Sequence, residues 1–279
     1  MKRTLASVLV LGLLAGAFMG LKVRIDRIPR RKIPGSSIIY IPSGKYLKMA
    51  TFGFSPVVAD IIYIWAIQYY ANTAIEDRYT HLTHVFSIIS ELDPSYVDPY
   101  VVGALIAVED TRDVALALKI LDSGLAKNPG QWIFPLEAGH YAQLYLKDYA
   151  LAKEYYRKTM EIPGAPEIAK RLYAATSFKA NDLQTAWETW LEVARTASDP
   201  QIRKIASNHL YQVKAAVDAG IVRDAVARFR SAYGRNPAAF EDLVRAGILV
   251  RLPKDYDEKD YLYDPATGEI KTQVVPWKR

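Results

Sequence analysis

Apolar positions recur along the chain with a helical spacing. Two apolar residues lie four positions apart, the second of them large, and this pair returns every 34 or 35 residues. The first positions are Leu82, Ala117, Ala152 and Ala186, and the second are Phe86, Leu121, Tyr156 and Trp190. Because residues four apart share one face of a helix, each pair predicts a helix that buries this face against a neighbour.

Prolines mark the ends of these repeated units. They are Pro94, Pro129, Pro163 and Pro200, and the first three are spaced by 35 and 34 residues. A proline cannot continue a helix, and two helices of about 12–14 residues with two short turns fill about 34 residues. Asp148 and Asp182 suit the turn inside a unit and the N-cap of its second helix. The pattern therefore predicts an all-α fold with four helical hairpins over residues 52–200.

The first hairpin opens with residues 52–70, which are apolar nearly all round. Ser55 suits the N-cap of this helix and Pro56 its first position. A helix without a polar face is expected to be buried. A second membrane span is the alternative, although Asp60 interrupts the stretch and the apolar run is short for a span.

Residues 201–250 predict a terminal helical unit that caps the repeats. It comprises helices at 202–219 and 221–232, followed by a short helix that Pro237 starts and Gly247 ends. Residues 251–279 form a separate tail. Within it, residues 261–263 and 269–275 flank an Asp-Pro-Ala-Thr-Gly turn, which predicts a β-hairpin.

The N-terminal segment predicts a membrane anchor over residues 1–23. Residues 4–21 are uncharged and would form a helix about 27 Å long, against a hydrocarbon core of roughly 30 Å. A cleaved signal peptide with a site at residues 15–17 is the alternative. Gly12, Gly16 and Gly20 share one helix face, so they are candidates for close helix packing and a homodimer.

Positive charge follows this segment and is not spread over the body. Residues 1–32 hold eight Lys and Arg and one Asp, whereas residues 33–279 hold 28 basic and 29 acidic residues. This distribution does not support nucleic-acid binding. The basic cluster at residues 22–32, which overlaps the start of a juxtamembrane linker at 24–51, is instead expected to meet anionic lipid. The positive-inside count places the body in the cytoplasm and a signal-type N-terminus places it outside; we expect a single-pass bacterial inner-membrane protein with a periplasmic body.

The repeat resembles the tetratricopeptide (TPR) family over about residues 60–200. The residues that carry the resemblance are Asp182, Ala186 and Trp190, with Asp148, Tyr149, Ala152 and Tyr156 and the terminal prolines. Positions of the first helices match only approximately, at Trp65, Gly139 and Ala174, and the turns of the second to fourth units lack glycine. The resemblance implies an α-solenoid whose first helices line a concave, protein-binding surface.

Aromatic and basic residues gather on the predicted first helices of the third and fourth units. The candidate partner-binding residues are Tyr141, Tyr145, Arg171, Phe178 and Lys179. Aromatic rings beside cations suit the binding of a peptide or helix from another protein. Ordinary packing between helices is the alternative reading for each of them.

The tail resembles the C-terminal segment of type II secretion pseudopilins. The shared elements are Pro237, Leu243-Val244-x-x-Gly247-x-Leu249 and Leu252-Pro253, and then Tyr263-Asp264-Pro265-x-Thr267-Gly268-Glu269. The N-terminal processing signature of pseudopilins is missing, so the chain is not a pilin subunit. The resemblance implies a shared local structure or a link to the same machinery.

The sequence contains no convincing catalytic, cofactor or metal site. His81 and His84 are spaced to share a metal, but no third ligand follows at helical spacing. The acidic run from Asp255 to Asp264 does not fit a calcium loop, and the chain has no cysteine. We therefore expect a non-catalytic membrane-anchored adaptor in a bacterial envelope assembly of the secretion or pilus type. The alternatives are an accessory protein that binds envelope glycan and a structural dimer formed through the anchor.

Overall fold

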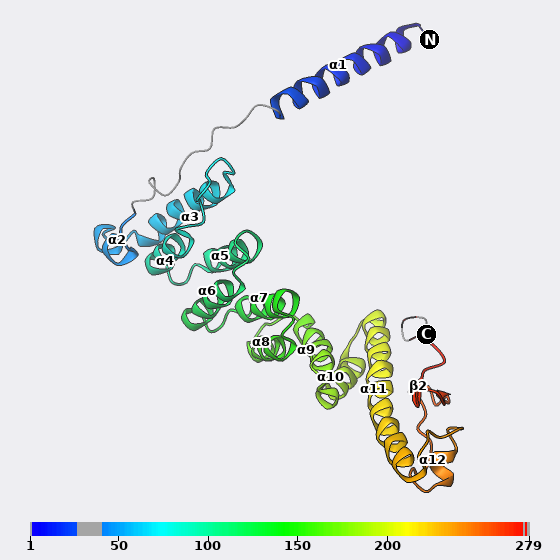
Figure 1. Ribbon diagram of the computed structural model, residues 1–279. Coiled ribbons are helices and arrows are strands. Elements are labelled where there is room, and N and C mark those ends of the chain that lie inside the picture. The colour runs from blue at the N-terminus through cyan, green and yellow to red at the C-terminus, as the bar shows by residue number, and fades with distance from the viewer. Residues whose placement is uncertain (1, 27–40, 276, 278–279) are drawn as a thin grey trace. The chain divides into compact units, whose positions relative to one another are not determined.

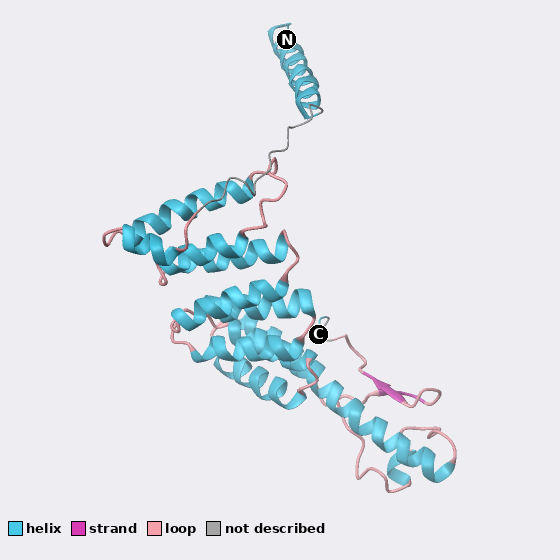
Figure 2. Ribbon diagram, turned by 60° about the vertical axis from the view of Figure 1, so that its left-hand side comes forward, coloured by secondary structure: helices cyan, strands magenta, loops and turns pink. Residues whose placement is uncertain are grey.

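A computed structural model describes residues 2–26, 41–275 and 277 of the 279-residue chain, with side chains in the first helix described from Val10 to Ile25. The described residues are mostly helical, and their only two named strands form one small hairpin (Figure 2), so the all-α prediction is confirmed. They divide into two compact units, residues 1–93 and 94–279.

The described residues of unit 1 form four helices. They are α1 (Lys2–Asp26), α2 (Gly44–Ala50), α3 (Ser55–Ala71) and α4 (Leu82–Leu92). Both α2 and α3 pack against α4, whose buried face includes Leu82 and Phe86. Gly44 lets α2 approach closely, since a Cβ there would lie 2.6 Å from the Cβ of Glu91. The predicted helix start at Ser55 and Pro56 is confirmed to within one residue.

Among the residues that the structure describes, no helix is both long enough and apolar enough to cross a membrane. The predicted anchor at residues 4–21 begins in the part of α1 whose side chains lie outside the description. Half of the predicted linker at 24–51, and most of the basic cluster at 22–32, falls on residues 27–40, which also lie outside the description.

Unit 2 is a succession of helices in which each packs against the next (Figure 1). The helices are α5 (Val97–Glu109), α6 (Val114–Lys127), α7 (Ile133–Tyr141), the π-helix η1 (Ala142–Leu146), α8 (Tyr149–Glu161), α9 (Ile168–Lys179), α10 (Leu183–Thr196) and α11 (Pro200–Tyr233). With α3 and α4 of unit 1, they make the four predicted hairpins. All eight residues of the repeated apolar pairs are buried, as predicted.

The turns inside the hairpins of unit 2 share one construction. Asp113, Asp148 and Asp182 cap α6, α8 and α10 by accepting a hydrogen bond from the backbone N–H three residues later. The residue before each Asp, Arg112, Lys147 or Asn181, has a φ near +60°. The backbone of each of these residues therefore adopts the left-handed conformation, which a glycine would adopt more easily.

The terminal unit differs from the prediction. The two helices expected at 202–219 and 221–232 are one helix, α11, so the predicted break at Gly220 is wrong. A glycine inside a helix costs only about 1 kcal/mol relative to alanine. Packing of the flanking buried residues Asp218 and Val222 outweighs that loss. The short helix α12 (Asp242–Arg245) begins five residues after Pro237, and Gly247 follows it at φ +67°.

The tail forms the predicted hairpin and packs along α11. Strand β1 (Leu262–Asp264) pairs antiparallel with β2 (Glu269–Lys271), with Tyr263 opposite Ile270. The second strand ends earlier than the expected Val275. Tyr261 joins Val222 and Phe229 of α11 in one apolar cluster. The tail is therefore part of unit 2 and not a free extension.

Candidate functional site

The predicted partner-binding residues lie on the first helices of two neighbouring hairpins. Tyr141 is the last residue of α7 and Tyr145 lies in η1. Arg171, Phe178 and Lys179 lie on α9. The α8 helix packs against both α7 and α9, so these two first helices belong to one continuous packed array.

The π-helix η1 widens the end of the first helix in the third hairpin. It ends at Leu146 and is followed by Lys147, whose φ is +57°, and the N–H of Asp148 donates to the carbonyl of Ala142 at 3.1 Å. Gln143 ties the segment down, because its Oε1 accepts hydrogen bonds from Tyr156 Oη at 3.3 Å and Thr176 Oγ1 at 2.9 Å. π-helical turns are rare and often lie at functional sites.

This turn leaves three consecutive large side chains in solvent. Leu144 is 54% exposed, Tyr145 37% and Leu146 46%. Glu109, at the end of α5, accepts a hydrogen bond from Tyr145 Oη. We call Glu109, Leu144, Tyr145 and Leu146 the η1 surface. It combines apolar area with a carboxylate, and the contact between Tyr145 and Glu109 links two hairpins.

Tyr141 and Tyr145 lie together but in different environments. Their ring centroids are 6.0 Å apart and the rings are nearly perpendicular, at 74°. Tyr141 is buried, and burial together with nearby Glu137 raises its pKa to about 12. The hydrogen bond to Glu109 raises the pKa of Tyr145 above its ordinary value. Both phenols are therefore neutral at physiological pH, and the ring of buried Tyr141 packs against the ring of Tyr145.

The three candidates on α9 are placed differently. Phe178 packs against the buried cluster that contains Trp190, which gives it a packing role. Arg171 is partly exposed, and its Nε is buried without a hydrogen bond to any of the described residues. Lys179 is exposed, with its Nζ 5.4 Å from the centroid of the Tyr149 ring. No hydrogen bond, ion pair or ring contact between described side chains joins these three to Tyr141 or Tyr145.

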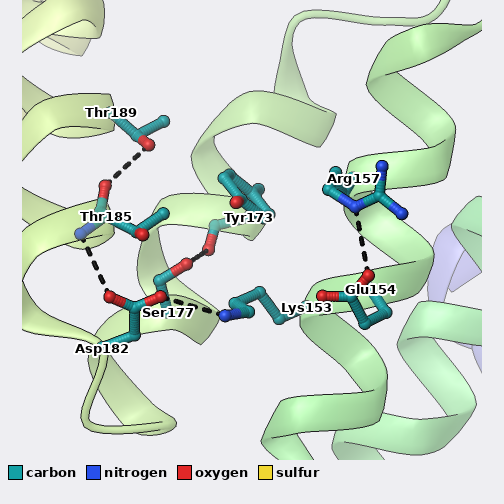
Figure 3. Close-up of polar contacts among 8 residues, drawn as sticks. All are labelled: Lys153, Glu154, Arg157, Tyr173, Ser177, Asp182, Thr185 and Thr189. Atoms are coloured by element: carbon teal, nitrogen blue, oxygen red, sulfur yellow. Dashed lines mark hydrogen bonds and ion pairs between the residues drawn. The ribbon is translucent and has the colours of Figure 1, made fainter.

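Polar contacts fix the spacing of the third and fourth hairpins. Lys153 of α8 places its Nζ 3.0 Å from Oδ2 of Asp182, the N-cap of α10 (Figure 3). The hydrogen bond from Lys153 lowers the pKa of Asp182, and the backbone N–H of Thr185 donates to the same carboxylate at 3.2 Å. The ion pair thus holds neighbouring second helices in register, and through them the first helices that carry the candidate residues.

The structure also describes the surroundings of the three glycines on α1 and of two histidines. Ideal Cβ atoms at Gly12, Gly16 and Gly20 on α1 would meet no atom within 4 Å. His81 precedes α4, and the Nε2 of His84 lies 2.9 Å from the carbonyl oxygen of Ile41. In the searched part of the chain, no three His, Asp or Glu side chains gather as a metal site would require.

The acidic tail residues have structural contacts. Asp255 is buried, and its Oδ1 accepts hydrogen bonds from the N–H groups of Asp257 and Lys259, both at 2.9 Å. Its Oδ2 lies 3.0 Å from Tyr211 Oη on α11. These contacts satisfy the carboxylate and fasten the tail to α11.

Sequence reasoning missed three of the four residues of the η1 surface. Glu109, Leu144 and Leu146 were not among the residues that the sequence predicted to bind a partner. Nothing in the Gln-Leu-Tyr-Leu-Lys-Asp run signals a π-turn. No protein-family model and no curated protein matches the chain.

Proposed function

We propose that this chain is a non-catalytic, membrane-anchored adaptor that binds another protein through the first helices of a TPR-like array. The observation that carries the proposal is the η1 surface, where Leu144, Tyr145 and Leu146 are exposed in one turn. Hydrogen bonds from Tyr156 and Thr176 to Gln143 hold this turn. Exposed aromatic and aliphatic side chains on a preformed surface are typical anchors for a protein partner, because little entropy is lost when they are covered.

The charges beside this surface favour a partner segment with both apolar and basic side chains. Glu109 accepts the Tyr145 hydroxyl, and its only ion pair among the described residues is with exposed Arg112 at 3.7 Å. Exposed pairs of this length are weak. A Lys or Arg of the partner would therefore find a carboxylate next to the apolar side chains.

The membrane anchor and the cellular location are proposed mainly from the sequence. Residues 4–21 are uncharged, and the chain is helical from Lys2 to Asp26. The apolar side chains described in α1, including Leu13, Leu14 and Phe18, are exposed, which supports a lipid-facing segment. We propose a single-pass protein of a bacterial inner membrane, with a periplasmic body that serves an envelope assembly.

A structural dimer through α1 is the second candidate. The open space over Gly12, Gly16 and Gly20 supports it, since a second helix can approach a surface without Cβ contacts. This role is compatible with the adaptor and would double the number of η1 surfaces in one assembly.

The adaptor proposal is tested by comparing two double variants of the tagged full chain. Leu144→Ser with Tyr145→Ser removes one aliphatic and one aromatic side chain from the η1 surface. Tyr233→Ser with Val250→Ser removes the same types from exposed positions elsewhere in unit 2. After in-cell crosslinking and purification, co-purified proteins are quantified by mass spectrometry.

We expect the first variant to lose at least one partner about tenfold, which corresponds to roughly 1.4 kcal/mol of binding energy. The second variant should retain that partner. If both variants recover the same partners in equal amounts, while far-UV circular dichroism shows both folded, the η1 surface is not the binding site.

A further inference from the structure

The corner between α2 and α3 carries large apolar side chains in solvent. Phe52 is 91% exposed and Phe54 69%. The exposed set around them, which we call the α2–α3 corner, is Tyr46, Met49, Phe52, Phe54 and Val57. Ile61 and Ile64 extend it along α3 at helical spacing and are exposed as well. Single exposed apolar residues are ordinary on proteins, but a contiguous set of this kind marks an interaction surface.

The backbone holds Phe52 outward at an unfavourable conformation. Its φ is +48° and that of Gly53 is +96°. Bulky side chains rarely adopt a positive φ. Two hydrogen bonds close the turn, from Phe54 N–H to the carbonyl of Thr51 at 2.9 Å and from Thr51 Oγ1 to the carbonyl of Lys48 at 2.8 Å. Strained positions of this type cluster at functional sites. Here the strained turn presents an aromatic ring to solvent.

The corner lies in the part of the chain that carries its positive charge. Residues 1–64, which include the corner and its extension along α3, contain ten Lys and Arg and two Asp, whereas the remaining 215 contain 26 basic and 28 acidic residues. The second of these aspartates, Asp60, is exposed on α3 between Val57 and Ile61. Lys45 and Lys48 of α2 are exposed beside the apolar side chains. No acidic residue lies between positions 27 and 59. The occupant of this surface is therefore expected to be apolar and negatively charged.

We propose that the α2–α3 corner inserts into the headgroup region of an anionic lipid bilayer. Phe52 and Phe54 enter the boundary with the acyl chains, and the ammonium groups of Lys45 and Lys48 remain at the level of the lipid phosphates. The inference rests on the anchor in the proposed function. Residues 27–40 can span at most about 50 Å when fully extended, so an anchored α1 keeps the corner within reach of the bilayer surface.

A single fluorophore in the full-length protein tests the insertion. Because the chain has no cysteine, Phe52→Cys gives one site for an environment-sensitive NBD label. Thr83→Cys, at an exposed position of α4 in the same unit, is the matched control. Each labelled protein is reconstituted with vesicles of phosphatidylcholine alone or mixed with phosphatidylglycerol, and with the same lipids brominated on their acyl chains.

We expect the label at position 52 to shift to the blue, to brighten several-fold on the mixed vesicles and to be quenched by the brominated lipids. The label at position 83 should not respond. Adding Lys45→Glu and Lys48→Glu should reduce the response at position 52. Lys119→Glu with Lys204→Glu, which changes the net charge equally at exposed positions of unit 2, should leave it unchanged.

Flotation with the vesicles reports on the anchor separately. If the protein floats but the labels at 52 and 83 respond alike, the corner does not insert and the proposal is wrong. If the position-52 response is the same on neutral and mixed vesicles, the selection of anionic lipid is wrong. If the protein does not float, the corner and the anchor both fail, whereas the η1 surface is judged by its own crosslinking experiment.

Discussion

Gly139 is the position where the packing of the repeat array can be tested most directly. It lies in α7, and an ideal Cβ at this position would be 2.6 Å from Cε1 of the Tyr156 ring on α8. That ring is fully buried. Its hydroxyl donates to Gln143, and the ring of His140 lies at a steep angle to it, 68°, with centroids 5.8 Å apart. Gly139→Ala therefore forces α7 and α8 apart.

Two opposing effects set the size of the change. Replacing glycine by alanine inside a helix stabilises it by about 1 kcal/mol, whereas an extra methyl group in a packed interface costs typically about 1–3 kcal/mol. Gly139→Ala should therefore lower the free energy of unfolding by up to about 2 kcal/mol. Gly220 of α11 is the control, because its ideal Cβ would meet no atom within 4 Å. Gly220→Ala should raise the free energy of unfolding by about 1 kcal/mol.

Urea unfolding of the two full-length variants measures this contrast. Far-UV circular dichroism follows the transition, and hydrogen exchange of α7 and α8 amides locates the loosened contact. The decisive quantity is the difference between the two substitutions, about 1–3 kcal/mol, since the helix-propensity gain is common to both. If Gly139→Ala and Gly220→Ala stabilise the protein equally, α7 and α8 do not approach at Gly139 as described.

Two further outcomes follow from single contacts. Lys153→Met should lower the free energy of unfolding by about 0.5–1 kcal/mol at pH 7. Because the ion pair lowers the folded-state pKa of Asp182, its contribution to stability is complete above the unfolded pKa of about 4 and is lost as the pH falls through the folded pKa. The penalty measured by urea titration should therefore shrink toward pH 2, and a pH-independent penalty would contradict this account. Tyr261→Phe removes the hydroxyl that lies 2.6 Å from Oδ2 of buried Asp218. The substitution should lower the free energy of unfolding by about 1–3 kcal/mol and speed amide hydrogen exchange in the tail. Unchanged exchange would show that other contacts hold the tail.

The repeated hairpins were predictable because their signals are local. Asp148 and Asp182 act as caps within one turn, and the apolar pairs need only a helical period to be recognised. The length of α11 was not predictable in the same way. Gly220 reads as a helix end in isolation, but residues on both sides of it are held by contacts with distant segments, such as that of Asp218 with Tyr261, which is 43 residues later. Tertiary contacts of this kind decide between a break and a continuous helix.

The candidate site shows the same division at the level of single residues. Tyr141 and Phe178 carry the residue types expected of a binding surface, yet four residues along the helix separate buried Tyr141 from exposed Tyr145. The change comes from η1, whose wider turn rotates the following side chains relative to a regular helix. That turn is fixed by Gln143, which accepts hydrogen bonds from Tyr156 and from Thr176, 33 residues away. The packing of three successive helices therefore determines which aromatic side chain is exposed to solvent. A partner that binds the η1 surface would depend on the packed array and not on a single repeat.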